Sequence, residues 1–298
     1  MWFNREIAPI LRAAFLRHPV LTLTGPRQSG KTSLVRRLFP DLPYHNLEDP
    51  RTREFATADP AAFLSQLEGG AVLDEIQQVP DLLSALQVVV DRLDRNGLFV
   101  LTGSYQMGLR HAIGQSLAGR TALHVLLPLS VREIMAAQGQ VPDLDELLLR
   151  GFLPRVHAQN QLPAEAYAAY VATYLERDLR DLSRLHNLSR YRRFLELCAG
   201  RTAGLVNKSA LASDVGVSAP TIEDWMSLLE TVYGIVRLPP WFENLRKRLV
   251  RSPKLHFLDT GVACHLLHID RVEQLKVHPL RGALFESMMA SEALKARF

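Results

Sequence analysis

Residues 25–32 of the chain are Gly25-Pro26-Arg27-Gln28-Ser29-Gly30-Lys31-Thr32, between an apolar run at 20–24 and a helical pattern at 31–39 that Pro40 ends. Strand, glycine loop and helix form the context that the pattern G-x-x-x-x-G-K-[ST] requires in a phosphate-binding loop. The two glycines let successive backbone N–H groups approach phosphate oxygens, and the positive end of the helix adds to that field. An ordinary glycine-rich turn is the alternative. It is disfavoured because the chain has only six lysines among 35 basic residues, and one of them is Lys31.

The motif assigns a chemical role to each end of the loop. We expect Lys31 to reach the β- and γ-phosphates of a nucleotide and the Thr32 hydroxyl to ligate Mg²⁺. The predicted nucleotide-binding residues are Gly25, Pro26, Arg27, Gln28, Ser29, Gly30, Lys31, Thr32 and Ser33. A guanine-specific enzyme is disfavoured, because residues 207–210, Asn-Lys-Ser-Ala, lack the Asp of the guanine-binding pattern. ATP is therefore the expected nucleotide.

An apolar strand at 71–73 ends in two adjacent acids, Asp74 and Glu75. Downstream of a phosphate-binding loop, this pattern predicts that Asp74 holds the Mg²⁺ shell and that Glu75 orients and polarises the attacking water. Hydrolysis suits such a pair, because one carboxylate is occupied by the metal while the other remains free. The alternative for Asp74 is a helix N-cap.

Two further positions are candidates for contacts with the reacting phosphate. The strand at 98–104 ends in Thr102-Gly103-Ser104, and either hydroxyl could bond the γ-phosphate or the water, although turn chemistry explains Gly-Ser equally well. Arg120 is a candidate for stabilising charge on the transferred phosphoryl group, in the same chain or in a neighbouring subunit of a homo-oligomer. A surface arginine is the competing interpretation.

The pattern of elements predicts an α/β fold. Strands at 20–24, 44–47, 71–74, 98–102 and 122–127 alternate with helical stretches near 60–67 and 81–94, which favours a parallel sheet. After residue 131 the pattern becomes helical, with helices at 164–185 and 190–198 and a helix-turn-helix at 208–230 in which Ser218 is a possible N-cap. A strand at 254–258 and a helix at 282–298 follow. We expect an ATP-binding domain at 1–131, a helical region at 132–204, a winged-helix-like region at 205–252 and a partial C-terminal domain at 253–298.

Several strings occur in the same order as in a large family of prokaryotic AAA-type ATPases, which this chain resembles over nearly its whole length. They are GPRQSGKT, LEDP at 47–50, AVLDEIQQVPDLL, LTGS, SLAGR and LPLS at 127–130. Members of that family carry a C-terminal domain of unknown function, which TYLERDLRDL at 173–182 and HPLRGALFE resemble. The resemblance implies an ASCE-type P-loop core with Glu75 as catalytic glutamate, Ser104 in the first sensor position and Arg120 as a possible finger.

The resemblance also bears on the C-terminus. Relatives look as if they continue into a small module similar to restriction-endonuclease folds, and Glu286 matches only its first acidic position. We therefore expect an incomplete module without nuclease activity, in a truncated product or fragment, with a loosely held last helix. The apolar residues expected to be exposed on that helix are Leu284, Phe285, Met288 and Met289.

Charge patterning bears on nucleic acid. The second helix of the helix-turn-helix, at 218–230, has three acids and no basic residue, so we expect it to serve the core through Ile222, Trp225, Met226 and Leu229 rather than to contact phosphates. The segment that follows is basic and predicts at most weak, sequence-independent contact with nucleic acid. The residues expected to make it are Arg246, Lys247, Arg248 and Arg251.

Composition limits the class of protein. The net charge is only +4, and two distant cysteines, Cys198 and Cys264, indicate neither a disulfide framework nor a zinc site. No membrane span or signal peptide is predicted, so the cytoplasm is the expected location. We expect a Mg²⁺-dependent ATPase that couples hydrolysis to a conformational change. The alternatives are a DNA-binding or transcription-associated module switched by ATP, and a truncated paralogue that binds nucleotide without hydrolysing it.

Overall fold

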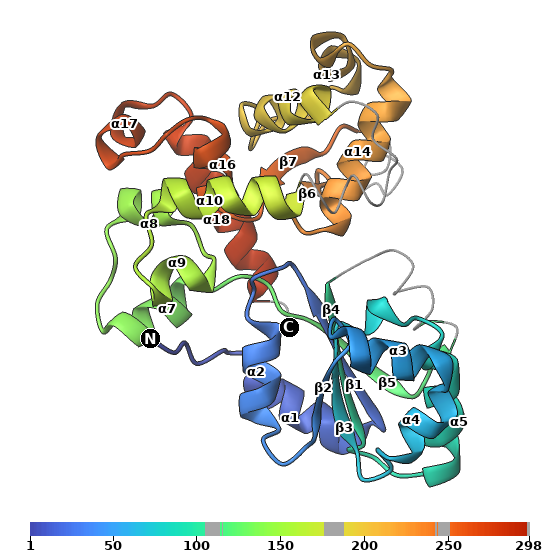
Figure 1. The fold of residues 1–298 in the computed structure, drawn as a ribbon. Helices are drawn as coiled ribbons and strands as arrows, with labels where there is room; N and C mark the ends of the chain where they lie inside the picture. The colour runs from blue at the N-terminus through green and yellow to red at the C-terminus, as the bar shows by residue number, and fades with distance from the viewer. Residues whose placement is uncertain (105–113, 115, 176–187, 242, 244–250, 297–298) are drawn as a thin grey trace. The chain divides into compact units, whose positions relative to one another are not determined.

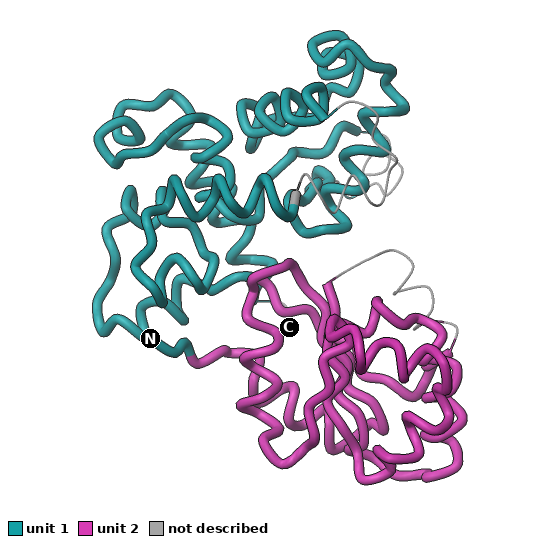
Figure 2. Tube along the Cα trace, viewed as in Figure 1, with its two compact units in different colours: residues 1–3, 128–297 teal, residues 4–127, 298 magenta. Residues whose placement is uncertain are grey.

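The computed structural model describes residues 1–104, 114, 116–175, 188–241, 243 and 251–296. The chain divides into two compact units, coloured separately in Figure 2. Asn4–Leu127 form the first, here the nucleotide unit, and residues 1–3 with the chain from 128 onward form the second, here the C-terminal unit. None of the helices in the described ranges combines the length and the apolar character that crossing a bilayer requires.

The nucleotide unit is built on a five-stranded sheet of order β2-β3-β4-β1-β5 in which every pairing is parallel (Figure 1). Its strands are β1 (Val20–Gly25), β2 (Tyr44–Asn46), β3 (Ala71–Asp74), β4 (Phe99–Ser104) and β5 (Thr121–Val125). Since β4 lies between β1 and β3, one strand separates the glycine loop from the acidic pair. The predicted parallel α/β sheet of a P-loop NTPase is thus confirmed.

Helices cover both faces of this sheet because successive strand residues point to opposite sides. Leu21, Leu23, Val72 and Val100 share a core with α1 (Ala8–Arg17) and α2 (Lys31–Leu38). The alternate residues of the strands pack with α3 (Pro50–Ala58), α4 (Pro60–Ser65) and α5 (Leu82–Leu93). Helix α3 was not predicted, although its signal was present: Asp49 accepts from Thr52 N as N-cap, and Pro50 opens the helix.

The C-terminal unit is mainly helical and has one core, which the helical, winged-helix-like and C-terminal segments share. Its first elements are α7 (Val131–Gln138), α8 (Leu144–Arg150), α9 (Pro154–Ala158), α10 (Pro163–Tyr170), the π-helical turn η2 (Val171–Leu175) and α12 (Leu188–Ala199). The expected long helix at 164–185 therefore changes geometry after Tyr170, and its residues from 176 lie outside the described ranges.

A helix-turn-helix follows α12. It comprises α13 (Lys208–Val215) and α14 (Ala219–Thr231), and Ser218 accepts from Thr221 N as the predicted N-cap. Ile222, Trp225, Met226 and Leu229 are buried, which confirms the core-facing side of α14. An antiparallel pair of β6 (Ile235–Leu238) and β7 (Lys254–Phe257) comes next. Strand β6 was not predicted, because its short apolar run carries Arg237.

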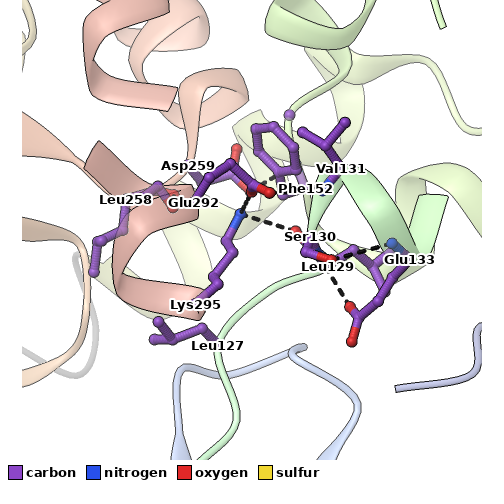
Figure 3. Close-up of polar contacts among 12 residues, drawn as sticks. Leu127, Leu129, Ser130, Val131, Glu133, Phe152, Leu258, Asp259, Glu292 and Lys295 are labelled. Atoms are coloured by element: carbon purple, nitrogen blue, oxygen red, sulfur yellow. Dashed lines mark hydrogen bonds and ion pairs between the residues drawn. The ribbon is translucent and has the colours of Figure 1, made fainter. Parts of the chain in front are cut away.

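The last helices are α16 (Thr260–Leu266), α17 (Val272–Val277) and α18 (Arg281–Lys295). The expectation of a loosely held last helix with four exposed apolar residues is wrong for Leu284 and Met288, which are buried, whereas Phe285 and Met289 are exposed. Lys295, at the end of α18, donates to the Leu129 carbonyl and to Glu292, each at 2.8 Å (Figure 3). Buried polar side chains of α18, as well as apolar ones, therefore pack against the rest of the C-terminal unit.

Candidate functional site

The glycine loop joins β1 to α2 with a backbone that requires glycine at both ends. Gly25 has φ +146° and Gly30 has φ +91°. A Cβ at position 25 would lie 2.2 Å from the carbonyl oxygen of Leu126, so the neighbouring chain admits no side chain there. The loop is thus fixed in its path by its neighbours, as a backbone cradle for phosphate requires.

Lys31 is buried at the start of α2, and its ammonium group donates to the carbonyls of Gly25 and Pro26 at 3.0 and 2.8 Å. The cation therefore lies against the first residues of the loop. The carbonyl of Ser29 accepts a bond of 2.7 Å from Arg5, whose other terminal nitrogen donates to Leu127 O at 2.6 Å. This buried arginine braces the loop, and no local signal in the sequence could have identified it, because it lies twenty residues upstream.

Asp74 ends β3 with its carboxylate surrounded by hydroxyl groups from three other elements. Thr32 of α2 donates to Oδ2 at 2.8 Å, Tyr44 of β2 donates to the same oxygen at 2.5 Å, and Thr102 of β4 donates to Oδ1. Burial, followed by the hydrogen bond to Asp74, raises the pKa of Tyr44 well above its ordinary value, so the phenol remains a donor. The structure thus brings the two predicted metal ligands, Thr32 and Asp74, into direct contact.

Glu75 and Ser104 are joined by a residue that was not predicted to belong to the site. Gln77, in the 3₁₀ turn Ile76–Gln78, donates through Nε2 to the Glu75 carboxylate and, at 3.0 Å, to the Ser104 hydroxyl. Ser104 is paired in register with Gly25, which places it beside the start of the loop. The only signal for Gln77 was its position two residues after the acidic pair.

Arg120 is far from these groups along the sheet. Its carbonyl accepts from Val20 N, at the first residue of β1, whereas the loop follows the last residue of that strand. Five residues of strand separate the two ends, about 16 Å. The guanidinium pairs with Asp91 through two bonds of 2.5 and 2.8 Å. The geometry therefore gives Arg120 no place at the loop of its own chain, and only a role beside a neighbouring molecule remains as a hypothesis.

The other predicted binding residues differ in exposure. Ser33 is exposed and Arg27 and Gln28 are half-buried, whereas Ser29 is fully buried. The Ser29 hydroxyl has no hydrogen-bond partner within the described part of the chain. A buried polar group of this kind is normally bonded, and a phosphate oxygen in the loop would supply an acceptor.

The predicted basic segment can be followed only in part. Arg246, Lys247 and Arg248 lie outside the described residues, and Arg251 is exposed. Arg237, which precedes them, donates to Glu223 at 2.7 Å and to Glu230 at 2.6 Å, so two acids of α14 already pair with it.

The residues at the carboxyl edge of the sheet fit a magnesium nucleotide. Hydroxyl and carboxylate oxygens are the ligands that Mg²⁺ prefers, and Thr32 and Asp74 offer one of each, already 2.8 Å apart. The glycine loop and Lys31 offer donors for phosphate oxygens. Within the described residues, no cluster of His, Cys, Asp and Glu forms a second candidate metal site.

Comparisons with known proteins agree with this geometry. Residues 17–135 match the model of an AAA domain, and residues 141–273 match a domain of unknown function (DUF8612). Uncharacterized proteins of Mycobacterium tuberculosis and Mycobacterium bovis are each 36% identical over 295 residues, which is 97% of this chain and 65% of the relative. The chain thus spans 65% of the length of the curated relatives it matches.

A solved structure extends the comparison to the fold. The Walker-type ATPase PABY2304 of Pyrococcus abyssi superposes with a TM-score of 0.61, covering 89% of this chain and 96% of its own, at 17% identity. At that identity the likeness concerns the fold alone.

Proposed function

We propose that this chain, an AAA-type P-loop ATPase with a C-terminal domain of unknown function, binds ATP with Mg²⁺ at Gly25 to Thr32 and hydrolyses it. The observation that carries the proposal is the Asp74 carboxylate, which receives the Thr32 hydroxyl of the glycine loop within one cluster of hydroxyl groups. Thr32 and Asp74 would hold Mg²⁺, which neutralises charge on the phosphates when bound. Lys31 would donate to phosphate oxygens, and Glu75 would take a proton from the attacking water.

The test is Mg²⁺-dependent release of phosphate from ATP by the full chain. Lys31→Ala should lower turnover by at least about 100-fold, because it removes a preorganised cation from developing phosphate charge. Lys208→Ala is the matched control: that lysine is half-exposed in the C-terminal unit and pairs with Glu223. Equal turnover in Lys31→Ala and the parent would overturn the proposal, and binding of ATP without turnover in the parent would favour the non-hydrolysing alternative.

We further propose that hydrolysis is coupled to a rearrangement of the C-terminal unit. The chain passes between the units just before Asn4. Phe3 is buried in the core of the C-terminal unit, and Arg5, two residues later, bonds the carbonyl of Ser29 in the loop. A shift of the glycine loop would therefore displace Arg5, and through the backbone it would pull on Phe3, which is anchored in the core of the C-terminal unit. Hydrogen exchange of residues 128 onward should change between ATP and ADP, and identical exchange in both states would oppose coupling.

Interaction with nucleic acid is a separate hypothesis, carried by Arg246, Lys247, Arg248 and Arg251. Each alanine substitution that removes a side chain bound to phosphate should reduce the log-log salt slope of DNA binding by about one. Tight binding to one sequence that survives these substitutions but fails in Thr221→Ala, at a half-buried position near the start of α14, would favour the transcription-associated alternative instead.

A further inference from the structure

One side chain at the candidate site links two of its functional groups. Gln77 donates through Nε2 to Glu75 and, at 3.0 Å, to the Ser104 hydroxyl. A primary amide nitrogen carries two protons, so these two bonds use its full donor capacity. The candidate general base, which follows β3, and the hydroxyl that ends β4 are thereby held by one planar group.

The orientation of this amide is determined by the chemistry of its partners. The Glu75 carboxylate only accepts hydrogen bonds, so the amide must turn its nitrogen toward Glu75. The oxygen then faces the other way. It is buried and has no hydrogen-bond partner among the described residues. A reversed amide would place two acceptor oxygens in contact, which is the less favourable arrangement.

The backbone conformation of Glu75 explains why its carboxylate depends on the hydrogen bond from Gln77. Glu75 has φ +58° and ψ +46°, a left-handed conformation that non-glycine residues rarely adopt. Glu75 is the first residue after β3, so no strand pairing fixes its backbone. Gln77 follows immediately in the 3₁₀ turn, and its amide returns to the carboxylate.

We propose that Gln77 is a positioning residue for ATP hydrolysis: its amide fixes the Glu75 carboxylate and the Ser104 hydroxyl in one arrangement beside the loop. This inference rests on the proposed function and deepens it. Because Gln77 acts through Glu75 and Ser104 rather than through the phosphate cradle, it should affect kcat and leave the affinity for ATP unchanged. Misplacement of a catalytic group by about 1 Å can cost about 100-fold in rate.

The experiment compares substitutions of two adjacent glutamines in the full chain. Gln77→Leu removes both donors, and Gln77→Glu keeps the size of the side chain but replaces the donors with oxygens. Gln78→Leu is the matched control, because Gln78 is half-buried in the same turn. Both Gln77 variants should lower kcat about 10- to 100-fold with KM and the Kd of MgATP within twofold of the parent, whereas Gln78→Leu should keep the parental kcat.

A role in packing alone predicts that Gln77→Glu, which conserves volume, retains kcat. That outcome would overturn the inference. So would an increase in kcat in Gln77→Leu, which would make the contact inhibitory, or an equal loss in Gln78→Leu. Circular dichroism of each variant checks folding, and Gln77→Glu serves as the second variant where Gln77→Leu fails to fold.

A double substitution isolates the route of the effect. In a Glu75→Gln background, Gln77→Leu should reduce the single-turnover rate by a smaller factor than it does in the parent, because the part of its effect that passes through the Glu75 carboxylate has already been removed. Independent, multiplicative losses would contradict the inference while leaving ATP hydrolysis intact. Failure of the proposed function is recognised separately: a parent without turnover, or unaffected by Lys31→Ala, overturns both.

Discussion

Asp74 of the nucleotide unit and Asp259 of the C-terminal unit are both buried, and they differ in what surrounds the carboxylate. Asp74 receives three side-chain hydroxyls, from α2, β2 and β4. Asp259 receives the backbone N–H groups of Phe152, Gly261 and Val262, at 2.9, 2.8 and 3.4 Å, and one hydroxyl, that of Tyr167. Hydroxyl groups can rotate to other partners, whereas backbone N–H groups move only with the chain. From this difference in donors we expect Asp74 to serve the chemistry of the site and Asp259 to serve the architecture of its unit.

The surroundings of Asp259 support this assignment. The carboxylate is the N-cap of α16, and a Cβ on Gly151 would lie 2.1 Å from the Tyr167 hydroxyl and 2.2 Å from the carboxylate. The chain thus closes tightly over the group. Figure 3 shows Asp259 with Phe152 and the neighbouring pair of Lys295 and Glu292. In this cluster the polar contacts hold α18 and the start of α16 in their unit.

The largest expected effect is a loss of turnover without a loss of stability, caused by a substitution in the nucleotide unit. Glu75→Gln should lower kcat by about 10²- to 10⁴-fold, because an amide cannot take a proton from water as a carboxylate does. The variant should still bind MgATP and keep the parental free energy of unfolding. Steady-state phosphate release and urea titration measure the two quantities. Glu54→Gln, at an exposed position of α3, is the control, and parental turnover in Glu75→Gln would remove that residue from the mechanism.

The second prediction concerns the C-terminal unit, where a substitution of Asp259 should lower stability and leave turnover unchanged. Asp259→Ala leaves buried N–H groups and a hydroxyl without an acceptor, so the free energy of unfolding of this unit should fall by about 3 kcal/mol. All three tryptophans, Trp2, Trp225 and Trp241, belong to this unit, so their fluorescence in urea reports its unfolding. Turnover per folded molecule should be unchanged. Asp224→Ala, exposed on α14, is the control, and a loss of turnover without a loss of stability would reverse the assignment.

The features that could be predicted from the sequence are those that short-range interactions determine. The strand, glycine loop and helix, the acidic pair and the N-cap of α14 depend on neighbours within a few residues, and all were predicted. Arg5, Tyr44 and Gln77 reach the site through strand order and backbone path, which a single sequence does not display. The family resemblance implied a finger role for Arg120, but this residue lies beside the start of β1, at the opposite end of that strand from the glycine loop of its own chain.

Burial of Asp259 gives a third, smaller effect, which depends on pH. Desolvation raises the pKa of Asp259 above its ordinary 3.8. In the window above pH 3.8 the folded state therefore binds more protons than the unfolded state, and stability falls as pH rises through the folded pKa. The decline cannot exceed about 1.4 kcal/mol per pH unit for one proton. In Asp259→Asn the same fluorescence titration should lack this component, and identical pH dependence in parent and variant would contradict it.

The smallest expected effect compares the two tyrosines that donate to the two aspartates. Tyr44→Phe removes one hydroxyl from Asp74 and leaves Thr32 and Thr102, so the carboxylate should be oriented less well toward Mg²⁺. The Mg²⁺ concentration that gives half-maximal turnover should rise about tenfold, as for other residues that orient a ligand. Tyr167→Phe removes the corresponding hydroxyl from Asp259 and should lower the stability of the C-terminal unit by about 1 kcal/mol while leaving the Mg²⁺ requirement unchanged. A shift of the Mg²⁺ requirement in both variants, or in neither, would contradict this comparison. Each variant removes one hydroxyl from an aspartate, so equal outcomes would mean that the two aspartates do not differ in function as their donors indicate.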